Sequence, residues 1–151
     1  MSKILNIITH PNENLRKVSS KVDFEKENSS KFQNHLNDLV LTMQEKDGIG
    51  LAAPQVDDAR RIFIVNAKEG PLVLINPVVT HKSFRKNKME EGCLSVPGIN
   101  GIVKRPYSIK INALTRDGKS YKEKINGLLA RVVQHEIDHL NGILFIDKVI
   151  K

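Results

Sequence analysis

The residues best suited to chemistry stand in the segment HEIDH at positions 135–139. Residues four apart lie on one face of an α-helix, so a helix here would direct the imidazoles of His135 and His139 at one point. This spacing is typical of a metal site in which Glu136 moves protons beside the cation. The alternative is a solvated helical face that carries histidines by chance. Apolar residues flank the segment and favour burial, where unpaired imidazoles are costly, so the sequence favours a metal site.

A catalytic metal needs three protein ligands and one open position for water, so a third ligand must come from elsewhere in the chain. Cys93 is the best candidate, because Gly92 before it and Pro97 after it indicate a fixed turn that would hold the thiol at a set angle. It is the single cysteine of the sequence, so it cannot form an internal disulfide, and a lone thiol suits a reducing compartment. A buried cysteine with a purely apolar role is the simpler alternative.

Other histidines and acids compete with Cys93 for the position of third ligand: His10, His35, His81, Glu136 and Asp138. His35 falls in the polar part of a predicted helix and His81 in a charged run, so both are more simply surface residues. Helical phase directs Asp138 away from the histidine pair, which suits a residue that orients a ligand or caps the helix. Sequence spacing leaves the choice open, because the third ligand approaches through the tertiary fold.

A glycine-rich segment, GIGLAAPQ at positions 48–55, is a further unusual feature. Gly48 and Gly50 permit close approach of the backbone to a ligand, while Pro54 fixes the turn that presents Gln55. The spacing matches neither the P-loop nor the dinucleotide-binding fingerprint. Taken alone, the segment is more consistent with an ordinary glycine-rich loop.

Two helices are expected to position these residues. Ser29 or Ser30 can cap the first, whose apolar residues recur at helical spacing as far as Met43. The second is expected from about position 126 to the Asn-Gly pair at 141–142; it is apolar around much of its circumference and should therefore be central.

Short β-rich runs lie between the two predicted helices, and an Asp-Gly hairpin turn joins the last two of them. The runs cover positions 62–65, 72–79, 109–114 and 119–125. Together with the helices they predict an α+β fold, with mostly antiparallel β-sheets packed around a central helix that carries the H-E-x-x-H motif.

Length and composition set the class of protein. The 151 residues suit a single domain over positions 1–151, and 40% hydrophobic with 27% charged residues argue against extensive disorder. No apolar stretch suits a membrane span or a secretory signal, so a soluble, cytoplasmic protein without membrane contact is expected. The formal net charge of +7 favours weak attraction to RNA-rich surfaces, but the basic residues are scattered, so no specific nucleic-acid partner is expected.

Three segments, taken together, resemble the signature motifs of the peptide deformylases in order and separation: GIGLAAPQ at 48–55, EGCLS at 91–95 and QHEIDH at 134–139. The resemblance extends from the His10-Pro11 pair to about Asp147, nearly the whole chain, and three ordered motifs are far more specific than H-E-x-x-H alone. It implies a metal-dependent hydrolase of N-terminal methionine processing, which removes the N-formyl group from the N-terminal methionine of nascent peptides and releases formate.

The resemblance also implies how the chemistry is divided. Cys93, His135 and His139 would bind one divalent metal ion, and Glu136 would act as the general acid and base. Several cations suit one thiolate and two imidazoles. The family resemblance favours Fe(II) in the cell, with Zn, Ni or Co as alternatives.

The substrate contacts follow from the same resemblance. Gln55 and the backbone N–H of Leu94 would face the formyl oxygen of an N-formylmethionyl peptide. Backbone groups of Ile49 and Gly50 would align the peptide. The pocket for the methionine side chain would be lined by Gly50, Leu128, Val132 and His135.

Two departures from the family pattern concern partners rather than chemistry. Few residues follow Gly142, so the chain resembles the short members of the family that lack the C-terminal helix. Since that helix is associated with docking on the ribosome, weak ribosome association at most is expected, together with a monomeric state. Asn100 stands near the position where many relatives have an arginine beside the substrate entrance, which is expected to weaken contact with the peptide.

Two other functions compete with this one. A zinc peptidase also uses H-E-x-x-H, but its usual third ligand is a histidine or glutamate downstream, and after His139 the sequence holds no further histidine and only the acid Asp147. A non-catalytic module that binds RNA or the ribosome would explain the net charge and would need no metal. Release of formate from formyl-Met peptides, rather than cleavage of unblocked peptides, would distinguish a deformylase from a zinc peptidase. Replacing Glu136 would abolish turnover in an enzyme but would leave a binding module unaffected.

Overall fold

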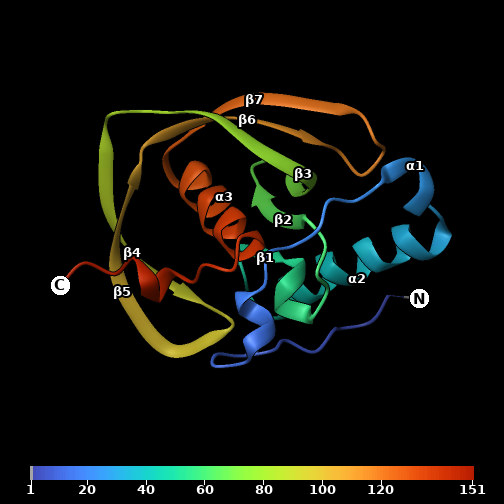
Figure 1. The fold of residues 1–151 in the computed structure, drawn as a ribbon, viewed down its shortest axis with the longest axis horizontal. Helices are drawn as coiled ribbons and strands as arrows, with labels where there is room; N and C mark the ends of the chain where they lie inside the picture. The colour runs from blue at the N-terminus through green and yellow to red at the C-terminus, as the bar shows by residue number, and fades with distance from the viewer. Residues whose placement is uncertain (1) are drawn as a thin grey trace.

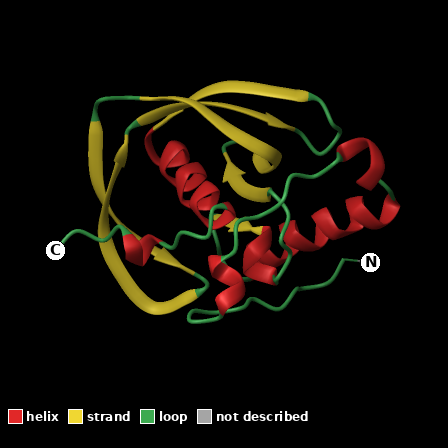
Figure 2. Cartoon of the chain, in the orientation of Figure 1, coloured by secondary structure: helices red, strands yellow, loops and turns green. Residues whose placement is uncertain are grey.

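The computed structural model describes residues 2–151, which form a central helix between a five-stranded sheet and a separate β-hairpin (Figures 1 and 2). The helical elements are η1 (Glu13–Arg16), α1 (Phe24–Glu27), α2 (Ser30–Glu45), η2 (Ala53–Val56), α3 (Gly127–Leu140) and η3 (Phe145–Asp147). The strands are β1 (Gly50–Ala52), β2 (Ile62–Ala67), β3 (Gly70–Lys82), β4 (Lys86–Cys93), β5 (Val96–Pro106), β6 (Ser108–Leu114) and β7 (Ser120–Asn126). The strand ladders are antiparallel, which confirms the predicted α+β class.

The first predicted helix is α2. The Ser29 hydroxyl accepts a hydrogen bond from the Phe32 N–H at 3.1 Å, so it satisfies one of the free donors of the first turn. Leu36, Leu39 and Met43 follow at helical spacing and are fully buried. The apolar stripe thus fixes α2 against the sheet, and the prediction of this helix is confirmed.

The second predicted helix is α3, which runs through the middle of the molecule (Figure 1). It ends at Leu140, Asn141 is its C-cap, and Gly142 follows with a φ of +75°. A Cβ at Gly142 would lie 2.3 Å from the carbonyl oxygen of Arg16, so both the backbone conformation and the close contact require glycine. This stop places the H-E-x-x-H motif in the last two turns of the helix.

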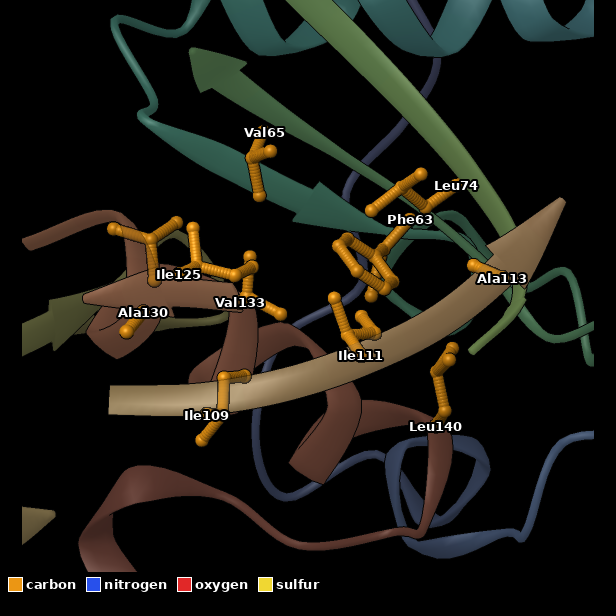
Figure 3. Close-up of a cluster of buried hydrophobic side chains, with 12 residues drawn as sticks. Phe63, Val65, Leu74, Ile109, Ile111, Ala113, Ile125, Ala130, Val133 and Leu140 are labelled. Atoms are coloured by element: carbon orange, nitrogen blue, oxygen red, sulfur yellow. The ribbon is translucent and has the colours of Figure 1, made fainter. Parts of the chain in front are cut away.

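The five-stranded sheet has the order β1-β2-β3-β6-β7 and packs its inner face on α3. All four β-rich runs predicted from the sequence are strands of this sheet, and Gly118 occupies the turn between β6 and β7 with a φ of +79°. Figure 3 shows the buried cluster between sheet and helix, which includes Phe63, Leu74, Ile111 and Val133. Apolar burial therefore sets the position of α3 against the sheet.

The hairpin β4–β5 was not predicted as strands, and it belongs to a different apolar cluster. Val96 and Val103 of β5 pack with Leu144 and Phe145 from the segment after α3. Figure 1 shows the hairpin beside α3, on the side where the chain ends. Among residues 2–151, no helix has the length and apolar character needed to cross a bilayer.

Candidate metal centre

Cys93, His135 and His139 meet at one point, although 42 residues separate the cysteine from the first histidine. Cys93 ends strand β4 and the two histidines lie one turn apart on α3. The sulfur and one ring nitrogen from each histidine all lie within 4.8 Å of one another, and Sγ of Cys93 is 3.3 Å from Nε2 of His139. The structure thus brings together the three residues that the sequence predicted as ligands.

The His135 ring is oriented from the side away from the sulfur. Its Nδ1 lies 3.0 Å from a carboxylate oxygen of Glu91, and its ring stacks on Phe145 at a centroid distance of 6.2 Å. A carboxylate at Nδ1 favours a proton on that nitrogen and leaves the Nε2 lone pair free. This is the usual arrangement for an imidazole that binds a cation through Nε2.

Glu91 is buried and is held by two arginines as well as by His135. Arg105 donates to both of its oxygens, at 2.7 and 2.9 Å, and Arg131 donates to one of them. Burial opposes ionisation of the carboxyl, but the hydrogen bonds from Arg105 and His135 outweigh burial and hold the pKa of Glu91 well below its usual range. Glu91 therefore carries a negative charge toward His135.

The imidazoles differ in their proton affinity. Burial, together with the nearby positive charges of His135 and Arg105, lowers the pKa of His139 well below its usual value, so this ring is neutral. Burial also lowers the pKa of His135, but its hydrogen bonds to Cys93 and Glu91 outweigh burial and raise it to about 10. A metal ion binds a neutral imidazole. A cation here would therefore displace the second proton that the raised pKa keeps on the His135 ring.

The donor set fits a divalent transition metal. One soft sulfur and two imidazole nitrogens are the ligands that Zn, Fe(II), Co and Ni accept. Among residues 2–151, four buried side-chain atoms have no hydrogen-bond partner, and one of them, Oε1 of Glu136, belongs to a residue in the wall of the cavity beside these ligands. Buried polar atoms without partners are rare, and a polar ligand in the cavity would supply the partner that the Glu136 oxygen lacks.

Cys93, His135 and His139 are called the ligand cluster below. Glu136 lies beside this cluster on α3 and is buried. Burial raises its pKa to about 7, although the positive charges of His135 and Arg105 oppose the shift. A Cβ at Gly50 would lie 2.5 Å from Oε2 of Glu136 and 2.9 Å from Val132, so only glycine lets strand β1 approach the carboxyl this closely. A carboxyl that titrates near neutral pH can both accept and donate a proton.

The glycine-rich segment is not the plain loop that the sequence alone favoured. It forms strand β1 and the 3₁₀ turn η2, and that turn carries Gln55, of which 2% is exposed. Oε1 of Gln55 accepts from the Ala52 N–H at 2.9 Å, and Nε2 donates to Ser95 at 3.2 Å and to the Cys93 sulfur at 3.5 Å. The Gln55 amide is therefore held with its donor group toward the cluster.

A cavity of about 480 Å³ opens at the cluster. Cys93, Leu94, His135, Glu136 and Gln55 lie in its wall. The other substrate residues expected from the sequence line it too: Ile49, Gly50, Leu128 and Val132. Ile49 and Leu128 are largely exposed at its rim, so the cavity presents apolar surface to an incoming ligand.

The other candidate ligands lie outside the cluster. Nε2 of His35 is 2.8 Å from Asp58, and His81 is exposed on β3. Asp138 accepts from Arg105 at 2.8 Å and pairs with Lys148 at 3.0 Å. Asp138 thus belongs to the charged network behind His135 rather than to the cluster itself.

Sequence reasoning missed the residues that support the cluster, namely Glu91, Arg105 and Arg131. One signal was present, because Arg131 interrupts the apolar run of a helix that was expected to be buried. A charged residue in such a position needs a buried partner of opposite charge. The partner could not be named from the sequence, because it lies on another element.

Comparisons with known proteins point to one family over nearly the whole chain. A family model described as polypeptide deformylase matches residues 4–151. A relative from Alkaliphilus metalliredigens named peptide deformylase is 45% identical over 137 residues, which cover 91% of this chain and 90% of the relative. The crystal structure of peptide deformylase from Thermotoga maritima has a TM-score of 0.93 at 35% identity and covers 99% of both chains. A class I type b peptide deformylase from Acinetobacter baumannii with Met-Ala-Ser bound has a TM-score of 0.92 at 34% identity and covers 99% of this chain and 100% of its own.

Proposed function

This chain belongs to the polypeptide deformylase family, and we propose that Cys93, His135 and His139 hold one divalent cation beside Glu136. The reaction is hydrolysis of the N-formyl group on the N-terminal methionine of a nascent peptide, with release of formate. The observation that carries the proposal is the convergence of one sulfur and two imidazoles within 4.8 Å in the wall of an apolar cavity.

When bound, the cation supplies Lewis acidity that makes water nucleophilic near neutral pH and polarises the formyl carbonyl. Fe(II) is the metal proposed for the cell, and the same donors accept Zn, Ni or Co. The chain's own share of the chemistry falls to three groups around the cluster: Glu136, Gln55 and the Leu94 backbone.

Glu136 moves the proton. With a pKa of about 7 it takes the proton of the attacking water and gives it to the departing amine. Gln55 and Leu94 meet the charge that develops on the formyl oxygen. The Gln55 amide is already fixed by Ala52 and Ser95, and its contact with the Cys93 sulfur at 3.5 Å keeps its N–H group beside the reacting centre. The Leu94 N–H is the second donor proposed for the same oxygen.

The peptide is held by the cavity and by the edge of the sheet. Strand β1 is an outer strand of the five-stranded sheet, so backbone groups of Ile49 and Gly50 can pair with an extended peptide. Leu128 and Val132 offer an apolar slot that suits an unbranched thioether side chain. The tripeptide Met-Ala-Ser bound to the A. baumannii relative is of this kind. We also propose that the chain acts as one domain and as a monomer, with weak ribosome association.

The test is formate release from formyl-Met-Ala-Ser, with metal content measured on the same sample. We expect formate from the formylated peptide and no cleavage of unblocked Met-Ala-Ser. Glu136→Gln should keep its metal and lose at least about 100-fold in kcat, because no group then moves the proton. Glu90→Gln, on the exposed part of the cavity wall, is the matched control and should stay within about twofold. Cleavage of unblocked peptides, or full activity in Glu136→Gln, would overturn the proposal.

A further inference from the structure

Arg131 is the one residue of α3 whose side chain is hydrogen-bonded to both strands of the hairpin in the described part of the chain. Its side chain is 4% exposed. One terminal nitrogen donates to the carbonyl of Val103 on β5 at 3.0 Å, and the other donates to the carbonyl and side chain of Asn87 on β4 at 2.8 and 3.1 Å. A single guanidinium therefore joins the helix to both strands.

The junction that Arg131 makes is polar because helix and hairpin belong to different apolar clusters. The buried part of α3 packs with the five-stranded sheet, while Cys93 and the valines of β5 pack with the segment after α3. Between helix and hairpin lie Glu91, Arg105 and Asp138, which are paired with one another or with Arg131. The distance from the Cys93 sulfur to the histidines on α3 thus depends on buried charge pairs.

Arg131 is also linked directly to a histidine of the cluster. Arg131 and His135 are one helical turn apart, so they share a face of α3. They bind the same carboxylate, since Arg131 donates to one oxygen of Glu91 and Nδ1 of His135 lies 3.0 Å from the other. The orientation of His135 and the attachment of the hairpin are therefore coupled through one side chain.

We propose that Arg131 is a positioning residue for the cation site: it fixes the hairpin on α3 and thereby sets the approach of the Cys93 thiolate to His135 and His139. The inference rests on the proposed metal site. A guanidinium can satisfy a carboxylate and two carbonyls at once, because its donors lie in a planar fork, whereas the ammonium of lysine is a point charge on a flexible stem. Without the fork, the carbonyls of Asn87 and Val103 lose their donor, and the hairpin is no longer held at one distance from the helix.

The experiment compares four Co(II)-loaded proteins: the natural sequence, Arg131→Met, Arg131→Lys and Arg60→Met. Arg60 is the matched control, because it pairs with Asp58 at 2.9 Å and with Glu27 at 3.4 Å and makes none of the helix–hairpin contacts. Two quantities are measured on each protein. One is the rate of Co(II) loss into excess chelator, and the other is the position of the thiolate charge-transfer and d–d absorption bands, which report the geometry around the ion.

We expect Arg131→Met to lose Co(II) at least about 10-fold faster than the natural sequence, with shifted bands, because supporting contacts around a metal site commonly change affinity by that factor. Arg131→Lys should lie between the two, and Arg60→Met should stay within about twofold and keep its bands. Urea unfolding of the metal-free proteins is measured alongside, because a purely structural arginine would lower stability without moving the bands.

The other possible results test either the positioning role of Arg131 or the metal site itself. If Arg131→Met does not fold, Arg131→Lys carries the test, and bands and rates equal to those of the natural sequence would overturn the inference. Equal acceleration in Arg60→Met would overturn it too, because the effect would then be general destabilisation. A natural sequence that binds no Co(II) would overturn the proposed metal site itself, whereas tight binding with no response at Arg131 overturns the positioning role alone.

Discussion

The two sides of α3 are held by different forces. Toward the five-stranded sheet, Val133 and Leu140 pack against Phe63 and Ile111 in a cluster without charged groups (Figure 3). Toward the hairpin, Arg131 and His135 pair with Glu91, and Asp138 pairs with Arg105. Apolar packing on the sheet thus positions the helix that carries the two histidines, while the hairpin that carries Cys93 is attached through buried ion pairs.

Because the forces differ, substitutions on the two sides of α3 should lower stability for different reasons. Removing apolar atoms leaves a cavity, and the cost grows with the volume that is not refilled. Removing one member of a buried ion pair leaves its partner charged and unpaired, which costs more than the intact pair contributed. The hairpin side should therefore be the more sensitive side for metal retention, even though its pairs add little net stability while they are intact.

The largest effect is expected for Glu91→Ala, which leaves the buried guanidinium of Arg131 without a carboxylate partner and Arg105 with Asp138 alone. We expect the free energy of unfolding of the metal-free protein to fall by about 3–5 kcal/mol, and metal affinity to fall by roughly 10- to 100-fold because His135 loses the acceptor for its Nδ1 proton. Urea unfolding and chelator competition measure the two effects.

Leu74→Ala is the matched change on the apolar side, because Leu74 is fully buried in the cluster between sheet and helix. It should lower the free energy of unfolding by about 2–5 kcal/mol and leave metal affinity within about threefold. Equal loss of metal affinity in Leu74→Ala and Glu91→Ala would show that the two sides of α3 do not differ in the proposed way.

The same contrast explains what could be predicted from the sequence. Helix α3 and its histidine pair were predictable, because the spacing of four is a local property and the helix buries apolar residues at regular intervals. Strands β4 and β5 were not, because half of the β4 residues are charged and the one buried on it is Glu91, while β5 buries only Val96, Val103 and Arg105 of its 11 residues. A strand that is attached by ions carries no apolar alternation.

The site shows the same division. Cys93 was predicted as a ligand from its neighbours Gly92 and Pro97, but its approach to the histidines depends on the tertiary fold. Strand β1 was taken for a loop, because three residues beginning with a glycine are too short for a periodic pattern. The supporting arginines were missed for the same reason that the hairpin was: their partners are distant charges.

The third largest loss of stability is expected from a charge cluster away from the hairpin, formed by Asp58, His35 and Arg60. Burial opposes ionisation of Asp58, but hydrogen bonds from His35 and Arg60 outweigh it and lower the pKa of Asp58 to about 2. In the unfolded chain this pKa is about 3.9, so the unfolded state binds more protons between these values. The stabilisation, roughly 2 kcal/mol, is therefore complete above about pH 4 and is lost as the pH falls toward 2.

The measurement is the free energy of unfolding between pH 5 and 2 for the natural sequence and for Asp58→Asn, which cannot titrate at this position. The natural sequence should lose stability more steeply over this range, by roughly 2 kcal/mol in total. Parallel curves would mean that the contacts of Asp58 with His35 and Arg60 do not stabilise the folded protein in solution.

The smallest loss of stability is expected at the exposed end of the ion-pair network between α3 and the hairpin. Lys148 pairs with Asp138 at 3.0 Å, but its side chain is 42% exposed, and Asp138 keeps Arg105 at 2.8 Å when the lysine is removed. Lys148→Ala should therefore lower the free energy of unfolding by less than about 1 kcal/mol, and by less still in high salt, because water and ions screen an exposed pair. Urea unfolding at two salt concentrations measures both. A loss of more than about 2 kcal/mol would mean that Asp138 needs both Arg105 and Lys148. The buried and exposed ion pairs of the network would then be energetically coupled.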